Sequence, residues 1–140
     1  MATPLFHATL TVQTQSHDYP IVITEDSNAS NPKNIVSNTA ENAAENTTNN
    51  SAKKSSMASQ IAPYITGRQV LIVTNETVAP LYLKALQEEL EAQFTVKVCV
   101  LPDGEQYKNQ TSINQIYDAL MAEHFNRDVT LIALGGGVVG

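Results

Sequence analysis

The sequence is poor in cysteine, tryptophan and basic residues. It has one cysteine, Cys99, and no tryptophan, so no internal disulfide can form. Eight lysines and arginines stand against fourteen aspartates and glutamates, which gives a formal net charge of −6, and Lys53 and Lys54 are the only adjacent basic pair. This balance argues against a nucleic-acid backbone or an anionic membrane as the main partner, because both are held by clusters of basic side chains.

Long apolar runs are also absent. No stretch approaches the roughly 20 apolar residues of a membrane-spanning helix. The first residues, M-A-T-P-L-F-H, do not combine a basic region with an apolar stretch as a signal peptide does. Together with the lone cysteine, these absences predict a reduced protein of the cytoplasm.

Two short segments near the N-terminus predict a β-hairpin. Residues 8–14 alternate apolar and polar side chains, and residues 19–24 do so more loosely. The polar residues 15–18 between them suit a turn. The alternation predicts that one face of this hairpin is buried, and Pro20 suits the start of an edge strand.

A low-complexity segment follows at residues 25–60. It contains eight asparagines, and its only larger apolar residues are Ile35, Val36 and Met57. Such a segment buries too little apolar surface to offset the entropy lost on ordering. We therefore predict a largely disordered insertion whose end, residues 57–64, forms a short helix. The predicted organisation is a hairpin at 1–24, this insertion, and an α/β domain at 61–140.

Strands and helices alternate from Gln69 onward. The apolar run V-L-I-V at 70–73 is typical of a strand buried on both faces of a parallel sheet, and two further strands are predicted at 95–101 and 129–134. Since helices lie between them, the strands should be parallel. The predicted fold class is therefore α/β, with the N-terminal hairpin added to a partial Rossmann-like sheet.

Two helices connect these strands. The first is predicted to run through leucines at helical spacing to Phe94, with Pro80 in its first turn. The second is predicted at 111–125, where Ser112 and Gln115 have the spacing of a capping box. Its apolar stripe consists of Ile113, Ile116, Tyr117, Leu120 and Met121.

Three loops should meet at one edge of this sheet, because the carboxyl ends of parallel strands border a common crevice. Asn75 follows the first strand and either contacts a ligand or caps the next helix. The string D-G-E-Q-Y-K at 103–108 follows the second strand and either binds a nucleotide or forms a solvated turn. The glycines at 135–137 follow the third strand, where a ligand could approach the main chain.

Together, these three segments resemble a known family more specifically than any one of them does. T-N-E-T-x-A-P-L-Y, L-P-D-G-E-Q-Y-K and L-I-A-L-G-G-G-V-V-G are similar to segments of the 3-dehydroquinate synthases. The resemblance is strong over residues 69–140 and weaker over the hairpin at 8–24. The Asn-rich segment is longer than the family usually carries there, which suggests a lineage-specific surface insertion.

The resemblance implies an activity and its cofactors. In the family, a dinucleotide-binding domain precedes a helical metal-binding domain, and the enzyme is commonly dimeric. It converts the sugar phosphate 3-deoxy-D-arabino-heptulosonate 7-phosphate to 3-dehydroquinate and phosphate, in the shikimate pathway. NAD is used catalytically, and zinc or cobalt polarises an oxygen of the substrate.

The resemblance also assigns roles to particular residues. Asn75 corresponds to the contact on the adenosine side of NAD. The loop after the second strand corresponds to an NAD-binding segment, with Glu105 and Lys108 as direct contacts. The complete set of implied cofactor-binding residues is Asn75, Asp103, Gly104, Glu105, Gln106, Tyr107, Lys108, Gly136, Gly137, Val138, Val139 and Gly140.

The remaining family motifs would lie beyond Gly140. They include an aspartate at the nicotinamide end, the residues that grip the substrate and a Glu-His-His metal set, and none of His7, His17 and His124 matches a ligand. We therefore expect the front piece of a longer enzyme, with no catalytic residue or metal ligand in these 140 residues. Such a piece should be marginally stable and release no phosphate with NAD and zinc, so turnover in that assay would contradict the expectation.

Two alternatives stay open at this point. A related enzyme of the same architecture, such as a glycerol dehydrogenase, an iron-dependent alcohol dehydrogenase or a cyclase like 2-deoxy-scyllo-inosose synthase, shares part of the pattern. The string D-G-E-Q-Y-K argues against the dehydrogenases more than against the cyclases. The other alternative is a non-catalytic nucleotide-binding module.

Overall fold

The computed structural model describes residues 7–16, 18–24 and 56–140. The chain divides into two units, Met1–Ser56 and Met57–Gly140. Most of the predicted low-complexity insertion, and His17 in the predicted turn, lie outside the described residues. Within the described ranges, no helix combines the length and the apolar character that crossing a bilayer requires.

The predicted hairpin is present in the first unit. Strand β1 (His7–Val12) pairs antiparallel with β2 (Tyr19–Thr24), and Leu10 lies opposite Ile21. Within this unit the apolar face predicted to be buried is open, since Leu10 is 58% and Ile21 43% exposed. The described part of this unit is a single two-stranded layer, which cannot bury a face by itself.

The second unit begins with the predicted short helix. The helix α1 (Met57–Ile61) continues into one 3₁₀ turn, η1 (Ala62–Tyr64). Ala58 of α1 is buried and belongs to the main apolar cluster. This segment therefore packs as part of the α/β unit, although the surrounding composition is polar.

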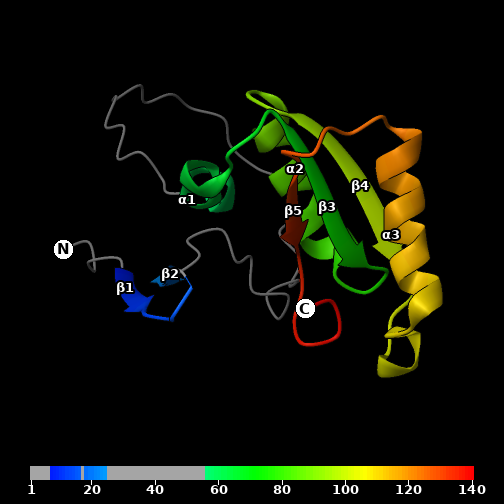
Figure 1. Ribbon diagram of the computed structural model, residues 1–140, viewed down its shortest axis with the longest axis horizontal. Helices are drawn as coiled ribbons and strands as arrows, with labels where there is room; N and C mark the ends of the chain where they lie inside the picture. The colour runs from blue at the N-terminus through cyan, green and yellow to red at the C-terminus, as the bar shows by residue number, and fades with distance from the viewer. Residues whose placement is uncertain (1–6, 17, 25–55) are drawn as a thin grey trace, which may run out of the picture. The chain divides into compact units, whose positions relative to one another are not determined.

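Three parallel strands form the sheet of this unit (Figure 1). Their order is β4-β3-β5, so the first strand in the chain lies at the centre. The second strand has the predicted bounds, the first begins one residue earlier and ends two residues later than the predicted run 70–73, and the third is one residue shorter at each end. The strands are β3 (Gln69–Asn75), β4 (Thr95–Leu101) and β5 (Thr130–Ala133).

The connection from β3 to β4 starts with a widened helical turn. The π-helical segment η2 (Ala79–Leu83) has Pro80 in its first turn and leads directly into α2 (Lys84–Glu91). The predicted helix therefore ends at Glu91 and not at Phe94. The Phe94 N–H instead donates to the Leu90 carbonyl over 2.9 Å in the turn that enters β4.

The connection from β4 to β5 contains the 3₁₀ turn η3 (Glu105–Tyr107) and helix α3 (Gln110–Ala122). The predicted capping box was wrong, because the Asn109 side chain accepts from the second and third N–H groups of the helix instead. The helix ends three residues before Phe125, since His124 has a φ of +53° and cannot continue it.

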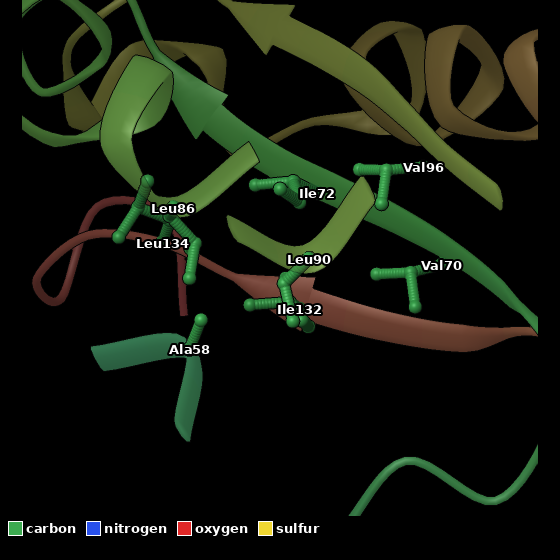
Figure 2. Packing of buried hydrophobic residues seen from close by; sticks show 8 residues of the cluster. All are labelled: Ala58, Val70, Ile72, Leu86, Leu90, Val96, Ile132 and Leu134. Atoms are coloured by element: carbon green, nitrogen blue, oxygen red, sulfur yellow. The ribbon is translucent and has the colours of Figure 1, made fainter. Parts of the chain in front are cut away.

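The larger apolar cluster lies on one face of the sheet. Alternate residues of β3 share this cluster with Leu86 and Leu90 of α2, and Figure 2 shows these side chains on the same side of the sheet. Val70 and Ile72 are fully buried, and Leu90 is 1% exposed. The cluster consists of Ala58, Val70, Ile72, Leu86, Leu90, Val96, Ile132 and Leu134.

The other face carries a smaller cluster under α3. Its buried members are Leu71, Val73 and Cys99, against which Ile116 and Leu120 of α3 are partly buried. The two helices thus cover opposite faces of the sheet (Figure 1), which makes the unit doubly wound.

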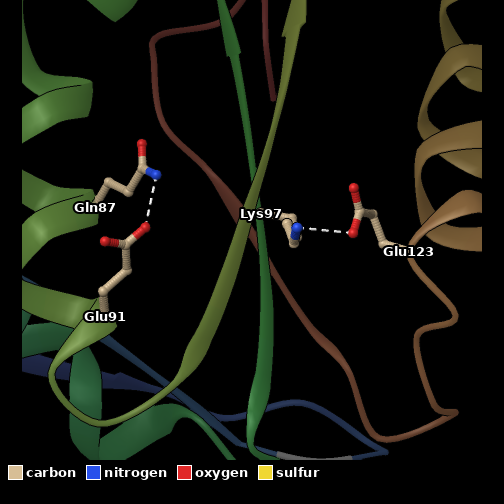
Figure 3. A network of polar contacts seen from close by, with 4 residues as sticks. All are labelled: Gln87, Glu91, Lys97 and Glu123. Atoms are coloured by element: carbon tan, nitrogen blue, oxygen red, sulfur yellow. Dashed lines mark hydrogen bonds and ion pairs between the residues drawn. The ribbon is translucent and has the colours of Figure 1, made fainter.

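Only two of the five apolar residues predicted to form the buried stripe of α3 pack against the sheet. Ile116 and Leu120 pack against the sheet, whereas Ile113, Tyr117 and Met121 are 45%, 60% and 76% exposed. At the end of α3, Glu123 forms an ion pair of 2.8 Å with Lys97 of β4 (Figure 3). The stripe is therefore wider than the surface that α3 covers.

Candidate functional site

The strand order creates a topological switch point. From the central strand β3 the chain crosses to β4 on one side and returns to β5 on the other. In open parallel sheets, ligand crevices border the carboxyl ends of the strands at such a point. This is the edge at which the three candidate loops were predicted to meet.

Asn75 ends the first of these strands instead of starting a loop. It is 4% exposed, and its Oδ1 accepts from the Val78 N–H over 2.8 Å. Its Nδ2 donates to Asp103 Oδ1 over 2.8 Å. The side-chain amide of Asn75 therefore has a protein partner at its oxygen and at its nitrogen.

The loop after β4 is held at both ends. Asp103 also accepts a hydrogen bond of 2.7 Å from Thr77 Oγ1. Gly104 has a φ of +124°, a conformation that side-chain-bearing residues rarely adopt, and it reverses the chain into η3. At the far end, the Ser112 hydroxyl of α3 donates to the Tyr107 carbonyl.

Charged side chains on this loop are exposed. Lys108 Nζ and Glu105 Oε2 lie 3.7 Å apart, with 40% and 70% of their side chains exposed. A pair this open interacts weakly in water. Both groups are therefore free to meet a charged ligand at little electrostatic cost.

The residue before the glycine loop, Leu134, is held in place by two hydrogen bonds. The Leu134 N–H donates to the Val73 carbonyl, and the Leu134 carbonyl accepts from the buried Thr74 hydroxyl, each over 2.8 Å. Beyond it, the Gly136 carbonyl accepts from the N–H groups of Val139 and Gly140 at 3.1 and 3.2 Å, which closes one helical turn.

The glycine turn presents unused donors and open space. The N–H groups of residues 135–138 have no hydrogen-bond partner among the described residues. A Cβ placed on Gly136 or Gly137 would meet no atom within 4 Å. Unpaired N–H groups at the start of a helical turn favour an anionic ligand.

A small cleft joins the three loops. It encloses about 220 Å3 including its open mouth, and it is lined by Asn75, Leu101, Pro102, Gly104, Tyr107, Val138 and Val139. Five of the twelve predicted residues therefore line one cleft. Leu101 and Pro102 were missed, although their position directly before D-G-E-Q-Y-K could have indicated them.

The other seven predicted residues do not line this cleft. They are Asp103, Glu105, Gln106, Lys108, Gly136, Gly137 and Gly140. All of them belong to the same two loops as lining residues of the cleft. Asp103 differs from the rest because both of its carboxylate oxygens are already hydrogen-bonded to protein.

Among the described residues, neither a metal-binding cluster nor the thiol of Cys99 contributes to this cleft. No cluster of three or more His, Cys, Asp or Glu side chains that could hold a metal ion occurs among the described residues. Burial raises the pKa of the Cys99 thiol, which keeps it protonated, and Cys99 lies in the smaller apolar cluster.

Comparisons with known proteins agree with this architecture. The family profile described as "3-dehydroquinate synthase N-terminal" matches residues 98–140. The 3-dehydroquinate synthase of Psychrobacter cryohalolentis is 75% identical over 140 residues, which cover 100% of this chain and 32% of that protein. That of Psychrobacter arcticus is 73% identical over 140 residues and 31% of its length.

A more distant relative matches a shorter stretch. The 3-dehydroquinate synthase of Acinetobacter baylyi is 59% identical over 81 residues, 57% of this chain and 22% of that protein. The two Psychrobacter alignments, by contrast, include the Asn-rich residues 25–60. The chain is similar over its whole length to these two 3-dehydroquinate synthases, and it spans about a third of their length.

Proposed function

We propose that this chain forms the NAD-binding part of a 3-dehydroquinate synthase. This lyase converts 3-deoxy-D-arabino-heptulosonate 7-phosphate to 3-dehydroquinate and phosphate, a step toward chorismate and the aromatic amino acids. The names of relatives up to 75% identical support the activity. They also favour it over the dehydrogenase and related-cyclase alternatives that the sequence left open.

One observation carries the proposal: residues from all three strand ends line a single cleft. The cleft lies at the switch point of a doubly wound parallel sheet, where dinucleotides bind in such folds. The Rossmann-like character of the unit is part of the proposal and rests on this position.

The groups present fit NAD. The unpaired N–H groups of the glycine turn could donate to its pyrophosphate, and the open space at Gly136 and Gly137 lets a ligand reach the main chain. Lys108 supplies a nearby positive charge, and Leu101 and Pro102 add apolar lining to the cleft. When bound, NAD supplies the acceptor and donor of a hydride.

A divalent metal does not fit the described residues. They offer no cluster of three ligating side chains, and the full-length relatives extend over about twice as many further residues. We derive no step through a metal from this chain. Zinc or cobalt, the sugar phosphate substrate, a homodimer and a cytoplasmic location belong to the proposal through the family resemblance alone.

Gly136→Ala tests the proposal. The new methyl would enter open space, and Gly136 is not among the glycines with positive φ, so the melting temperature should not change. Bound NAD⁺ would meet the methyl, and its affinity in calorimetric titrations of the 140-residue chain should fall at least about tenfold.

Two results would overturn this proposal. One is the absence of NAD⁺ binding by the unchanged chain. The other is equal affinity of the Gly136→Ala variant, which would place the nucleotide away from the glycine turn. Titration of ATP in parallel separates dinucleotide binding from general anion binding at the free N–H groups.

A further inference from the structure

The Asp103 carboxylate bridges two loops at the mouth of the cleft. Its Oδ1 accepts from Asn75 Nδ2 over 2.8 Å, and its Oδ2 accepts from Thr77 Oγ1 over 2.7 Å. Asn75 is the last residue of β3 and Thr77 lies just beyond it, whereas Asp103 lies just beyond β4. Hydrogen bonds to an ionised carboxylate are stronger than those between neutral groups.

The orientation of each group in this bridge is determined. Asp103 only accepts, so Asn75 must turn its NH₂ toward it, and this leaves Asn75 Oδ1 to accept from the Val78 N–H over 2.8 Å. Each carboxylate oxygen and both ends of the amide therefore have a protein partner. A ligand is not required to satisfy any of them.

We propose that Asp103, Asn75 and Thr77 are positioning residues that clamp the two loops and set the width of the cleft. This deepens the proposed function and rests on it for the identity of the ligand. The direct contacts are then left to other groups of the same loops, such as Lys108 and the glycine turn. Asp103, which the family resemblance groups with the NAD contacts, acts through its neighbours.

Substitutions at Thr77 distinguish a positioning role of Asp103 from direct contact between Asp103 and the ligand. It is exposed and does not line the cleft, and its hydroxyl bonds to Asp103. A change at Thr77 can therefore reach the ligand only through the clamp. Asp103 immediately precedes Gly104, whose φ of +124° directs the chain into η3, so loss of the clamp should loosen that turn.

Thr77→Val removes the hydroxyl with little change of shape, and Thr77→Ser retains it. The matched control is Thr95→Val, the same change at an exposed residue at the opposite end of the sheet. In the ligand-free 140-residue chain, the first readout is amide hydrogen exchange at Tyr107 and Lys108, whose N–H groups are bonded within η3 at 3.0 and 3.1 Å.

We expect Thr77→Val to speed exchange at these two amides about tenfold, as the loss of one charge-assisted hydrogen bond allows. Thr77→Ser and Thr95→Val should stay close to the unchanged chain. Unaltered exchange at Tyr107 and Lys108 in Thr77→Val would overturn the clamp, whatever the ligand.

The second readout is NAD⁺ affinity, which should be about tenfold weaker in Thr77→Val and restored in Thr77→Ser. If the unchanged chain binds NAD⁺ and Thr77→Val binds it equally well, the clamp fails while the proposed function stands. If the unchanged chain binds none, the proposed function fails and the exchange data alone decide on the clamp. If Asp103→Asn weakens binding and Thr77→Val does not, Asp103 contacts the ligand directly, and the positioning role is wrong.

Discussion

The two faces of the three-stranded sheet differ in how well they are covered. Beneath α2, eight residues form one buried cluster, whereas beneath α3 only three residues reach that degree of burial. On the α3 face, Leu131 of β5 is 54% exposed, while its neighbour Ile132 on the α2 face is 9% exposed. The stability of this unit should therefore come mainly from the α2 face.

The largest expected effect comes from Leu90→Ala on the α2 face. Leu90 is 1% exposed in the main cluster, and truncation leaves a cavity that costs about 2–5 kcal/mol of unfolding free energy. Urea unfolding followed by circular dichroism measures this. The matched control is Leu131→Ala, which should change the free energy by less than about 0.5 kcal/mol.

If Leu90→Ala does not fold, Ile72→Val removes one methylene from the same cluster and should cost about 0.5–1.5 kcal/mol. Equal costs for the buried changes and for Leu131→Ala would contradict the proposed difference between the faces.

A smaller effect is expected for Leu120→Ala on the α3 face. Leu120 is only partly buried against Leu71, Val73 and Cys99, so the loss should be about 1–2 kcal/mol. The same urea titration checks it. A loss as large as that of Leu90→Ala would show that the α3 face supports the fold as strongly as the α2 face.

The pH dependence of stability and the alkylation rate of Cys99 both measure how well α3 covers its face of the sheet. Burial raises the pKa of its thiol, so the folded chain holds this proton more tightly than the unfolded chain. Stability from this group is present below the thiol pKa of the unfolded chain and declines as pH rises above it. Alkylation at pH 8.5 should be at least about tenfold slower in the folded chain than in urea.

Cys99→Ala provides the control for that decline, because it removes the only thiol of the chain. Rapid alkylation of the folded chain, at the rate found in urea, would mean that α3 does not protect this face.

The smallest effect is expected for Glu123→Gln. Its ion pair with Lys97 joins α3 to β4 (Figure 3), but the two side chains are 42% and 44% exposed, so the cost should be below about 1 kcal/mol. Salt at about 0.5 M should remove most of it. The matched control is Glu91→Gln on α2, whose partner Gln87 is neutral and whose contribution should depend less on salt.

Much of this architecture could be predicted because the apolar patterns are local. The run V-L-I-V located β3, and the β-α-β-α-β order was enough to predict parallel strands and the edge where the loops meet. That prediction is confirmed by the cleft, which joins Asn75, Tyr107 and Val138. The roles of the twelve site residues remain predictions.

The wrong predictions for α3 concern its buried stripe and its N-cap. In both cases two sets of residues fit the sequence pattern equally well, and tertiary packing decides between them. Tyr117 and Met121 continue the stripe of Ile113, but the narrow sheet reaches only the next row of α3. Asn109 and Ser112 are both good N-caps, and the bond from the Ser112 hydroxyl to the Tyr107 carbonyl places Ser112 inside the helix. Neither outcome is visible in the spacing of the residues.

The central position of β3 also sets an order of assembly during folding. Val70 pairs with Val96 after one helical connection, but with Thr130 only after two. Loop closure costs more entropy for the longer connection, so we expect β3 and β4 to pair before β5 joins them. Pulsed hydrogen exchange during refolding should then show β5 amides protected last, and earlier protection of β5 would contradict this order. The glycine turn that follows β5 would accordingly be the last part of the cleft to form.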